Sequence, residues 1–257
     1  MIEQIDFHIK ELECMKKYPK ELFYKGNTQL LEAKKVAIVG SRKPNQYARN
    51  MTNILAAKLS KAGVCVVSGG AIGVDAIAHK AAGFTNTIMV AATGLDRRYP
   101  AINKNIIQQI EQDGLVLSQF AEGTPSQKYN FVLRNELVVA LGDVLVVTYA
   151  DKNSGTLRSI EYAKKMGKTI YVLPHRIGES EATNELLAKG EAQAIYDIEE
   201  FVGMFGTLQH NKEDDAFLAF CAHSPSYEEV LAKFPSRIFE AELRGEIVVK
   251  NGKVFKV

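Results

Sequence analysis

The chain has 257 residues, of which 46% are hydrophobic and 24% charged, which suits an ordered globular protein with a sizeable core. Its formal net charge is only +2, so any contact with nucleic acid has to come from a local basic patch and not from a basic surface overall. Cys14, Cys65 and Cys221 lie far apart, which argues against a disulfide framework and against a zinc site.

Residues 1–30 form a short lead-in to the rest of the chain. Ile2, Ile5, Ile9 and Leu12 recur at helical spacing and predict a helix. This stretch lacks the apolar centre of a signal peptide, and no later run approaches the length of a membrane span. We therefore expect a cytoplasmic protein with no membrane partner.

From Val36 onward, short apolar runs alternate with helical stretches. The expected strands cover residues 36–39, 64–67, 87–91, 115–118, 144–149, 169–173 and, at one edge, 194–196. The expected helices cover residues 47–62, 74–82, 102–112, 131–141, 157–166, 184–189 and 198–205. The strands are continuous Val/Ile runs, which are typical of a parallel sheet covered on both faces. This alternation predicts a doubly wound, Rossmann-like α/β domain with a mostly parallel sheet over residues 31–206.

The last fifty residues have a different organisation. Residues 207–215 are polar and lack periodicity, and we interpret them as a linker. Helical patterns follow over 216–221, 227–233 and 236–244. Two short β-prone runs flank Asn251-Gly252, a strong hairpin signal. Three helices followed by a hairpin predict a small winged-helix-like domain over residues 216–257.

Two glycine-containing loops follow the first two strands of the repeating region. The first reads Gly40-Ser41-Arg42, and the second reads Ser68-Gly69-Gly70 with Gly73 close behind. Glycine lets backbone approach a ligand closely, and a helix start presents free N–H groups to anions. Because ligands bind at the carboxyl ends of parallel strands, the loops predict a phosphate-binding ledge, with the forked guanidinium of Arg42 as a donor. The alternative is a pair of tight turns without a ligand.

A third stretch, far along the chain, combines cations with aromatic rings. It contains Lys128, Asn130, Phe131, Arg134 and Asn135. Single strands are bound by charge along the backbone and by stacking of bases on rings, so this stretch fits the other half of a nucleic-acid groove. The alternative is that Phe131 belongs to the core and that Lys128 is merely exposed.

Two further loops leave more than one interpretation open. The loop over residues 93–100 offers glycine, basic and aromatic groups, or is simply solvated. Ser154 precedes a helix and either caps it or helps to bind an anion; we favour the cap.

The patterns of common catalytic and metal sites are missing from the sequence. The five histidines have no metal-ligand spacing, and there is no nucleophile elbow, dinucleotide fingerprint or Walker lysine motif. We find no convincing acid/base pair. The sequence therefore predicts a phosphate-binding protein without catalytic residues, cofactor or metal.

In their order along the chain, the motifs resemble the DNA-processing protein A (DprA/Smf) family. The matching stretches are Tyr18-Pro19, Lys25-Gly26-Asn27, VAIVGSR (36–42), SGGAIGVD (68–75), Tyr99-Pro100, GTPSQKYNFVLRN (123–135), SGTL (154–157), Leu173-Pro174 and TNELLAKGE (183–191). The resemblance implies a Rossmann-like core that binds single-stranded DNA, protects it and helps to load the RecA recombinase during natural transformation. It also implies a homodimer that is not an enzyme.

The residues that match the family's DNA-binding pocket become the candidate nucleic-acid-binding set. With Ser68 of the same loop, the set is Gly40, Ser41, Arg42, Ser68, Gly69, Gly70, Lys128, Asn130, Phe131, Arg134 and Asn135. The chain departs from the family pattern at Val132, Glu136 and His175, where proline, arginine and glycine are usual. Glu136 is expected to place a carboxylate near the phosphate path. The N-terminal helical domain of many members is expected to be replaced here by the short lead-in.

Two other functions remain open at this point. A Rossmann-type nucleotide phosphoribohydrolase would use the same glycine loops, with Ser154-Gly155-Thr156 and Glu161 as the nearest match to its catalytic stretch. An interaction scaffold would instead act through the C-terminal module. The module's acidic residues compete with Lys233, Arg237 and Arg244, so we expect it to serve self-association or partner contact and not the reading of duplex DNA.

Overall fold

The computed structural model describes residues 1–152, 154–207, 212–243 and 245–256. The chain divides into two compact units, Met1–Leu208 and Gln209–Val257. Within the described residues, no helix combines the length and the apolar character needed to cross a bilayer.

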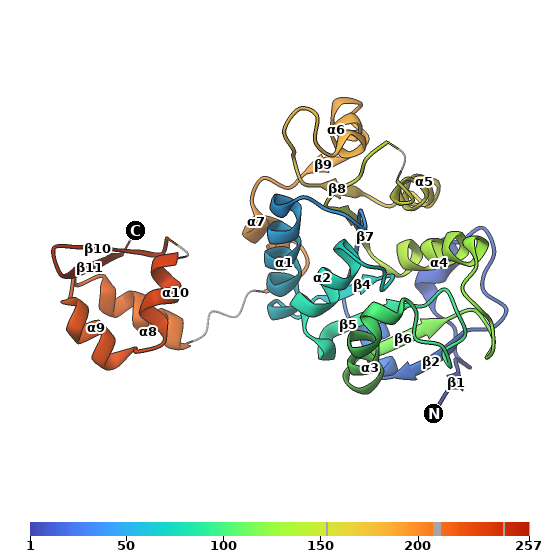
Figure 1. Cartoon of the computed structure of the whole chain (residues 1–257), viewed down its shortest axis with the longest axis horizontal. Coiled ribbons are helices and arrows are strands. Elements are labelled where there is room, and N and C mark those ends of the chain that lie inside the picture. Colours follow the sequence, from blue (N-terminus) through green and yellow to red (C-terminus); the bar gives the residue numbers. More distant parts are fainter. Residues whose placement is uncertain (153, 208–211, 244, 257) are drawn as a thin grey trace. The chain divides into compact units, whose positions relative to one another are not determined.

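A single sheet forms the centre of the first unit (Figure 1). Its strands are β1 (Glu3–Gln4), β2 (Phe23–Gly26), β3 (Lys35–Val39), β4 (Cys65–Ser68), β5 (Thr87–Val90), β6 (Leu115–Ser118), β7 (Val144–Val147), β8 (Ile170–Val172) and β9 (Gln193–Ala194). They lie in the order β1-β2-β6-β5-β4-β3-β7-β8-β9. Strands β3 to β9 are parallel, whereas β1 and β2 add an antiparallel edge beside β6.

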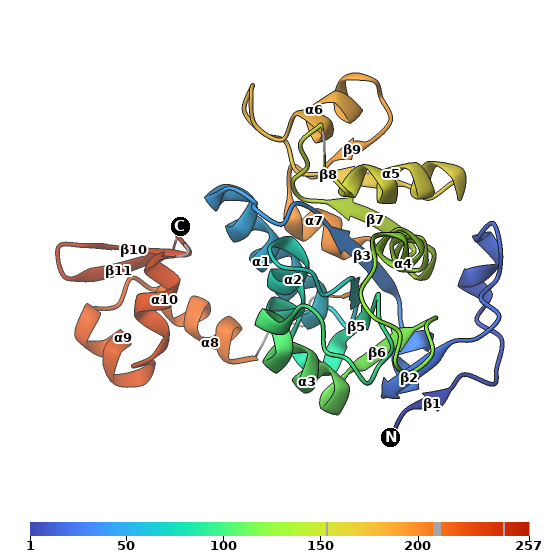
Figure 2. The same ribbon diagram turned by 45° about the vertical axis from the view of Figure 1, so that its right-hand side comes forward.

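Helices cover both faces of this sheet (Figures 1 and 2). They are α1 (Gln46–Lys61), α2 (Val74–Ala82), α3 (Lys104–Asp113), α4 (Lys128–Leu141), α5 (Thr156–Lys165), α6 (Glu181–Ala188) and α7 (Ile198–Gly203). Because side chains alternate along a strand, Val36 and Ile38 of β3 pack with α1, α2 and α7, whereas Ala37 and Val39 pack with α4, α5 and α6. The expected doubly wound α/β fold is confirmed.

The order of the strands creates a crevice beside β3. The chain passes from β3 to β4 on one side and reaches β7 on the other. The loops that follow β3 and β7 therefore leave the sheet in opposite directions at its carboxyl edge, which is where ligands bind in open α/β sheets.

The expected helix over residues 2–12 is wrong. Glu3–Gln4 form β1 and pair with Phe23 and Tyr24 of β2, and only a 3₁₀-helix, η1 (Lys10–Cys14), follows. The apolar spacing is real, because Ile9 and Leu12 are buried against the sheet. Tertiary pairing has overridden a weak local helical preference.

The second unit has its own small core. Its elements are α8 (Lys212–Cys221), α9 (Tyr227–Lys233), α10 (Arg237–Leu243), β10 (Ile247–Lys250) and β11 (Lys253–Lys256). The expected order of three helices and a hairpin is confirmed, with Asn251 and Gly252 both at positive φ in the turn. Of the expected linker 207–215, residues 208–211 lie outside the described residues, and α8 starts at Lys212, earlier than expected.

His79 on α2 is a buried titratable group in the first unit. Its Nδ1 lies 2.7 Å from the Thr87 hydroxyl, which itself donates to the Val66 carbonyl at 2.8 Å. The histidine nitrogen must therefore be the donor in the first of these bonds. Burial, aided by the charge of Arg134, lowers the pKa of His79 to about 3.

This lowered pKa predicts a loss of stability in mild acid. Below pH 6.5 the histidine is protonated in the unfolded chain but stays neutral in the folded one. The contribution of His79 to the free energy of unfolding is therefore lost as the pH falls from 6.5 toward 3. Between pH 7 and pH 5 the free energy of unfolding should fall by about 2 kcal/mol from this group. Urea denaturation of His79→Gln should show a smaller fall, and the exposed control His8→Gln should behave as the parent. An equal fall in parent and His79→Gln would contradict the assignment.

Candidate nucleic-acid interface

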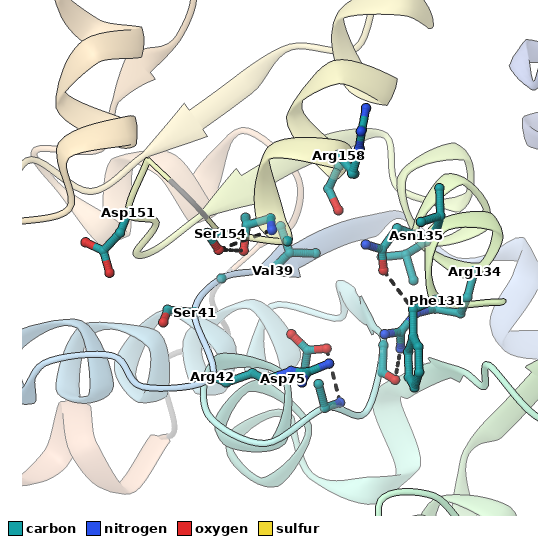
Figure 3. A pocket seen from close by; sticks show the side chains of 18 of the residues that line it. Val39, Ser41, Arg42, Asp75, Phe131, Arg134, Asn135, Asp151, Ser154 and Arg158 are labelled. Atoms are coloured by element: carbon teal, nitrogen blue, oxygen red, sulfur yellow. Dashed lines mark hydrogen bonds between the residues drawn. The ribbon is translucent and has the colours of Figure 1, made fainter. Parts of the chain in front are cut away.

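A cavity of about 730 Å³ occupies the crevice at the carboxyl edge of the sheet (Figure 3). One wall is the loop after β3, from Gly40 to Lys43, and the opposite wall is the start of α5 with the loop before it. The first three turns of α4 and the loop after β4 complete the lining. Segments that are far apart in the sequence thus meet here.

The two glycine-containing loops are in direct contact. The Val74 N–H donates to the Ser41 carbonyl at 3.2 Å. Gly73 has φ +82°, and a Cβ there would lie 2.5 and 2.6 Å from the carbonyl oxygens of Ser41 and Arg42. Only glycine allows this approach, so the expected paired ledge exists as a continuous backbone surface.

Arg134 of α4 is buried beneath this ledge, with only 5% of its surface exposed. Its Nη1 donates to the Gly69 carbonyl and, at 3.1 Å, to the Val90 carbonyl, while its Nε donates to the Asn135 side chain at 3.1 Å. A Cβ on Gly69 would occupy the place of the guanidinium. Arg134 therefore joins α4 to the ends of β4 and β5.

Asp75 is the buried anion beside Arg134. Its carboxylate accepts the Ala71 N–H at 3.2 Å. Burial raises the pKa of Asp75, and the positive charge of Arg134 opposes this rise. Burial also lowers the pKa of Arg134, and the negative charge of Asp75 opposes this fall. The opposite charges of these two buried groups therefore stabilise each other, and Asp75 braces the loop after β4 by accepting the Ala71 N–H.

Phe131 stands above Arg134 with its ring partly exposed to the cavity. The guanidinium carbons of Arg42 and Arg134 each lie 5.9 Å from the ring centroid, within cation–π range. The Tyr99 ring lies 5.7 Å away in a tilted arrangement. Phe131 is thus a lining residue and not part of the core.

The exposed cations of the cavity differ in their partners. Arg158 forms an ion pair with Glu161 at 2.8 Å. Arg42 and Lys128 are exposed and form no ion pair with any residue that the structure describes. Their charges are therefore available to a ligand.

Eight members of the candidate set line the cavity: Gly40, Ser41, Arg42, Gly69, Lys128, Phe131, Arg134 and Asn135. Ser68, Gly70 and Asn130 do not. The Ser68 hydroxyl donates to the Ile38 carbonyl at 2.7 Å, the Gly70 carbonyl accepts from Asn103, and Asn130 donates to the Pro125 carbonyl. These three hold the loops in place and lie outside the lining, so their contact with nucleic acid stays a prediction.

Two other expectations at this site need correction. The Glu136 carboxylate does not lie among the described lining residues; it accepts the Lys16 N–H at 3.2 Å on the other side of α4. Ser154 precedes the N-cap of α5, which is Gly155, and its hydroxyl oxygen accepts the Thr156 N–H at 3.2 Å. It lines the cavity at the same time.

Several lining residues lie outside the candidate set that the sequence predicts. Lys43, Ala71, Val132, Val138, Asp151, Gly155, Thr156, Arg158 and Ser159 were not in the candidate set. Lys43 follows Arg42 directly, and that basic pair was a usable signal. Arg158 and Asp151 carried no such signal, because only the strand order brings the start of α5 beside the first loop.

The loop over residues 93–100 contributes a smaller recess beside the cavity. Tyr99 and Pro100 line this recess, of about 90 Å³, together with Arg42 and Phe131. Arg98 is engaged elsewhere, since it donates to Glu111 at 2.6 and 3.0 Å. Within the described residues, no group of three acidic, histidine or cysteine side chains could hold a metal ion.

Residues 4–206 match the family model described as DNA recombination-mediator protein A. The chain belongs to this family. It is 37% identical over 177 residues to the DNA processing protein DprA of Streptococcus pneumoniae, covering 67% of this chain and 62% of the relative. It is 30% identical over 235 residues to Protein Smf of Escherichia coli, covering 90% and 62%. The family expected from the motifs is confirmed.

Two solved structures of family members share the fold. DNA processing protein A from Helicobacter pylori is 42% identical with a TM-score of 0.78, over 79% of this chain and 95% of that one. The Streptococcus pneumoniae protein is 33% identical with a TM-score of 0.74, over 80% and 75%. The chain spans between 46% and 62% of the length of the first curated relatives that it matches.

The buried opposite charges of Arg134 and Asp75 predict a stability effect. Arg134→Met should lower the free energy of unfolding by about 3 kcal/mol, because it leaves Asp75 buried without a counter-ion and two carbonyls without a donor. Adding Asp75→Asn should recover part of the loss. Chemical denaturation measures both.

The matched control is Arg158→Met, an exposed arginine of the same cavity. It should stay within about 0.5 kcal/mol of the parent. An Arg134→Met variant as stable as this control would refute the bracing role.

Proposed function

We propose that the first unit binds single-stranded DNA in this cavity and that the chain acts as a recombination mediator that protects incoming DNA. One observation carries the proposal. Arg42 and Lys128, from segments more than eighty residues apart, bring unpaired positive charge to one cavity that also holds the ring of Phe131. Cations for the phosphates and a ring for a base are what a single strand requires.

The loops support this proposal through their backbone. The contact between the loops after β3 and β4 presents small residues at the floor of the cavity, so that phosphate oxygens can approach main-chain N–H groups. The structure of the Helicobacter pylori relative, which covers 79% of this chain, is described as showing a single-stranded DNA binding mode.

We further propose that the chain forms a homodimer and helps to load RecA, in keeping with the mediator description of its family. The second unit fits a contact role. Phe239 and Leu243 are exposed on α10, where Glu240 is also found, so this helix presents apolar side chains that suit a protein partner. We assign this winged-helix-like unit to self-association or partner contact.

We propose that the chain is not an enzyme. The alternative, a nucleotide phosphoribohydrolase, would need a glutamate at the bound ester. Glu161 is exposed, is paired with Arg158 and is not among the described lining residues, and the described lining includes no other glutamate. Incubation of the pure protein with AMP should release no ribose phosphate; turnover would revive the alternative.

Removal of the free cations predicts a change in the salt dependence of binding. Arg42→Ala and Lys128→Ala should each weaken binding of oligothymidine and should reduce the slope of log affinity against log salt by about 0.7, the value for one lost phosphate contact on a single strand. Fluorescence anisotropy at several salt concentrations measures both quantities.

Lys61→Ala serves as the control, since Lys61 is exposed at the far end of α1. It should leave affinity and slope unchanged. Undiminished binding by both cavity variants would rule out these residues as the phosphate ligands.

A further inference from the structure

A second aromatic group lies at the carboxyl edge of the sheet, outside the lining of the cavity. It consists of Tyr47 in the first turn of α1, Tyr149 after β7 and His175 after β8. His175 is in the centre: its ring centroid is 5.4 Å from that of Tyr47 and 5.2 Å from that of Tyr149. Both tyrosine rings stand perpendicular to it, at 90° and 86°.

The group is held in place by backbone contacts. His175 Nε2 donates to the Thr148 carbonyl at 2.8 Å, and the His175 N–H donates to the Asn184 side chain at 3.3 Å. Edge-to-face packing then fixes the neighbouring rings. Tyr47 nevertheless keeps 43% of its surface exposed. A rigid but accessible ring of this kind suits stacking of a planar ligand.

The aromatic group is continuous with the proposed phosphate ledge. The Ser41 N–H donates to the Tyr149 carbonyl at 2.8 Å. The residue that carries the Tyr149 ring is therefore hydrogen-bonded directly to the first glycine-containing loop. Lys43, between that loop and α1, lines the cavity itself. A ligand that leaves the cavity on this side meets the aromatic group next.

Two carboxylates lie near the aromatic group. Asp151 is exposed beside Tyr149, and it contributes with burial to raising the pKa of that phenol. Glu179 accepts from the Asn45 side chain at 3.0 Å, at the N-terminus of α1. Carboxylates at this distance repel phosphates but leave the face of a base unaffected.

We propose that the Tyr47–His175–Tyr149 group stacks a further nucleobase of the bound single strand, in addition to any base held at Phe131. This inference rests on the proposed function. Strand β8, which precedes His175, lies four strand spacings, or about 19 Å, from strand β5. Strand β5 precedes Tyr99, whose ring packs against that of Phe131. The group therefore contacts only oligonucleotides long enough to reach it from the cavity, and its contribution to the binding affinity does not depend on salt concentration.

The chain contains no tryptophan, which provides a direct test. In Tyr47→Trp the indole is the sole tryptophan of the protein, and stacking of a base should quench its fluorescence when an oligothymidine of about 16 nucleotides is added. An oligothymidine of about 4 nucleotides should leave it unquenched. Tyr227→Trp is the matched control, since Tyr227 has a similar exposed fraction, 38%, in the second unit.

Affinity supplies the second measurement. Tyr47→Ala should weaken binding of the longer oligonucleotide by about 5- to 150-fold, the range for loss of one stacked base, with the salt slope unchanged. Binding of the short oligonucleotide should be unaffected, which also shows that the variant is folded. Tyr47→Phe should bind like the parent.

The outcomes separate the two proposals. If the parent binds neither oligonucleotide, the proposed function itself fails. If the parent binds both, but Tyr47→Trp shows no quenching and Tyr47→Ala binds the longer strand normally, only the second stacking group is refuted. A fall in the salt slope of Tyr47→Ala would also refute it, because it would indicate a lost phosphate contact.

Discussion

The guanidinium of Arg134 holds the candidate site together. It joins a helix to the ends of two neighbouring strands, and it does so from a buried position with only 5% of its surface exposed. Asp75 supplies the opposite charge. Removing one of two buried opposite charges is more costly than exchanging both, so the loop after β4, the first turns of α4 and the ring of Phe131 are constrained as one unit.

This arrangement separates two tasks that the sequence alone assigns to a single set of basic residues. Buried Arg134 shapes the cavity, whereas exposed Arg42 and Lys128 carry the charge that a ligand can reach. The ring of Phe131 lies within 5.9 Å of a guanidinium of each kind and so connects the rigid part of the site to its accessible part. A pocket with a fixed floor and exposed cations at its rim is suited to binding a backbone without recognising a base sequence.

Much of the fold and site was predictable because it follows from local chemistry. Continuous Val/Ile runs and the glycines after them place the loops of Arg42 and Gly69 at one edge of a parallel sheet. The exceptions involve long-range partners. Strand β2 forms because Phe23 pairs with Ser118 of β6. The Glu136 side chain points away from the cavity because it accepts the Lys16 N–H. Neither partner can be identified from the residues next to Phe23 or Glu136 in the sequence.

The sequence by itself determined the alternation of strands and helices, the family motifs and the residue types at the strand ends, since periodicity and turn chemistry are local properties. Only the tertiary structure decided which of those residues face the ligand. Arg42 and Arg134 are the same residue type in two motifs far apart in the sequence, yet one is exposed and the other is only 5% exposed. The same holds for Tyr47, Tyr149 and His175, which become one aromatic group because the order β3-β7-β8 brings three distant segments to one edge of the sheet.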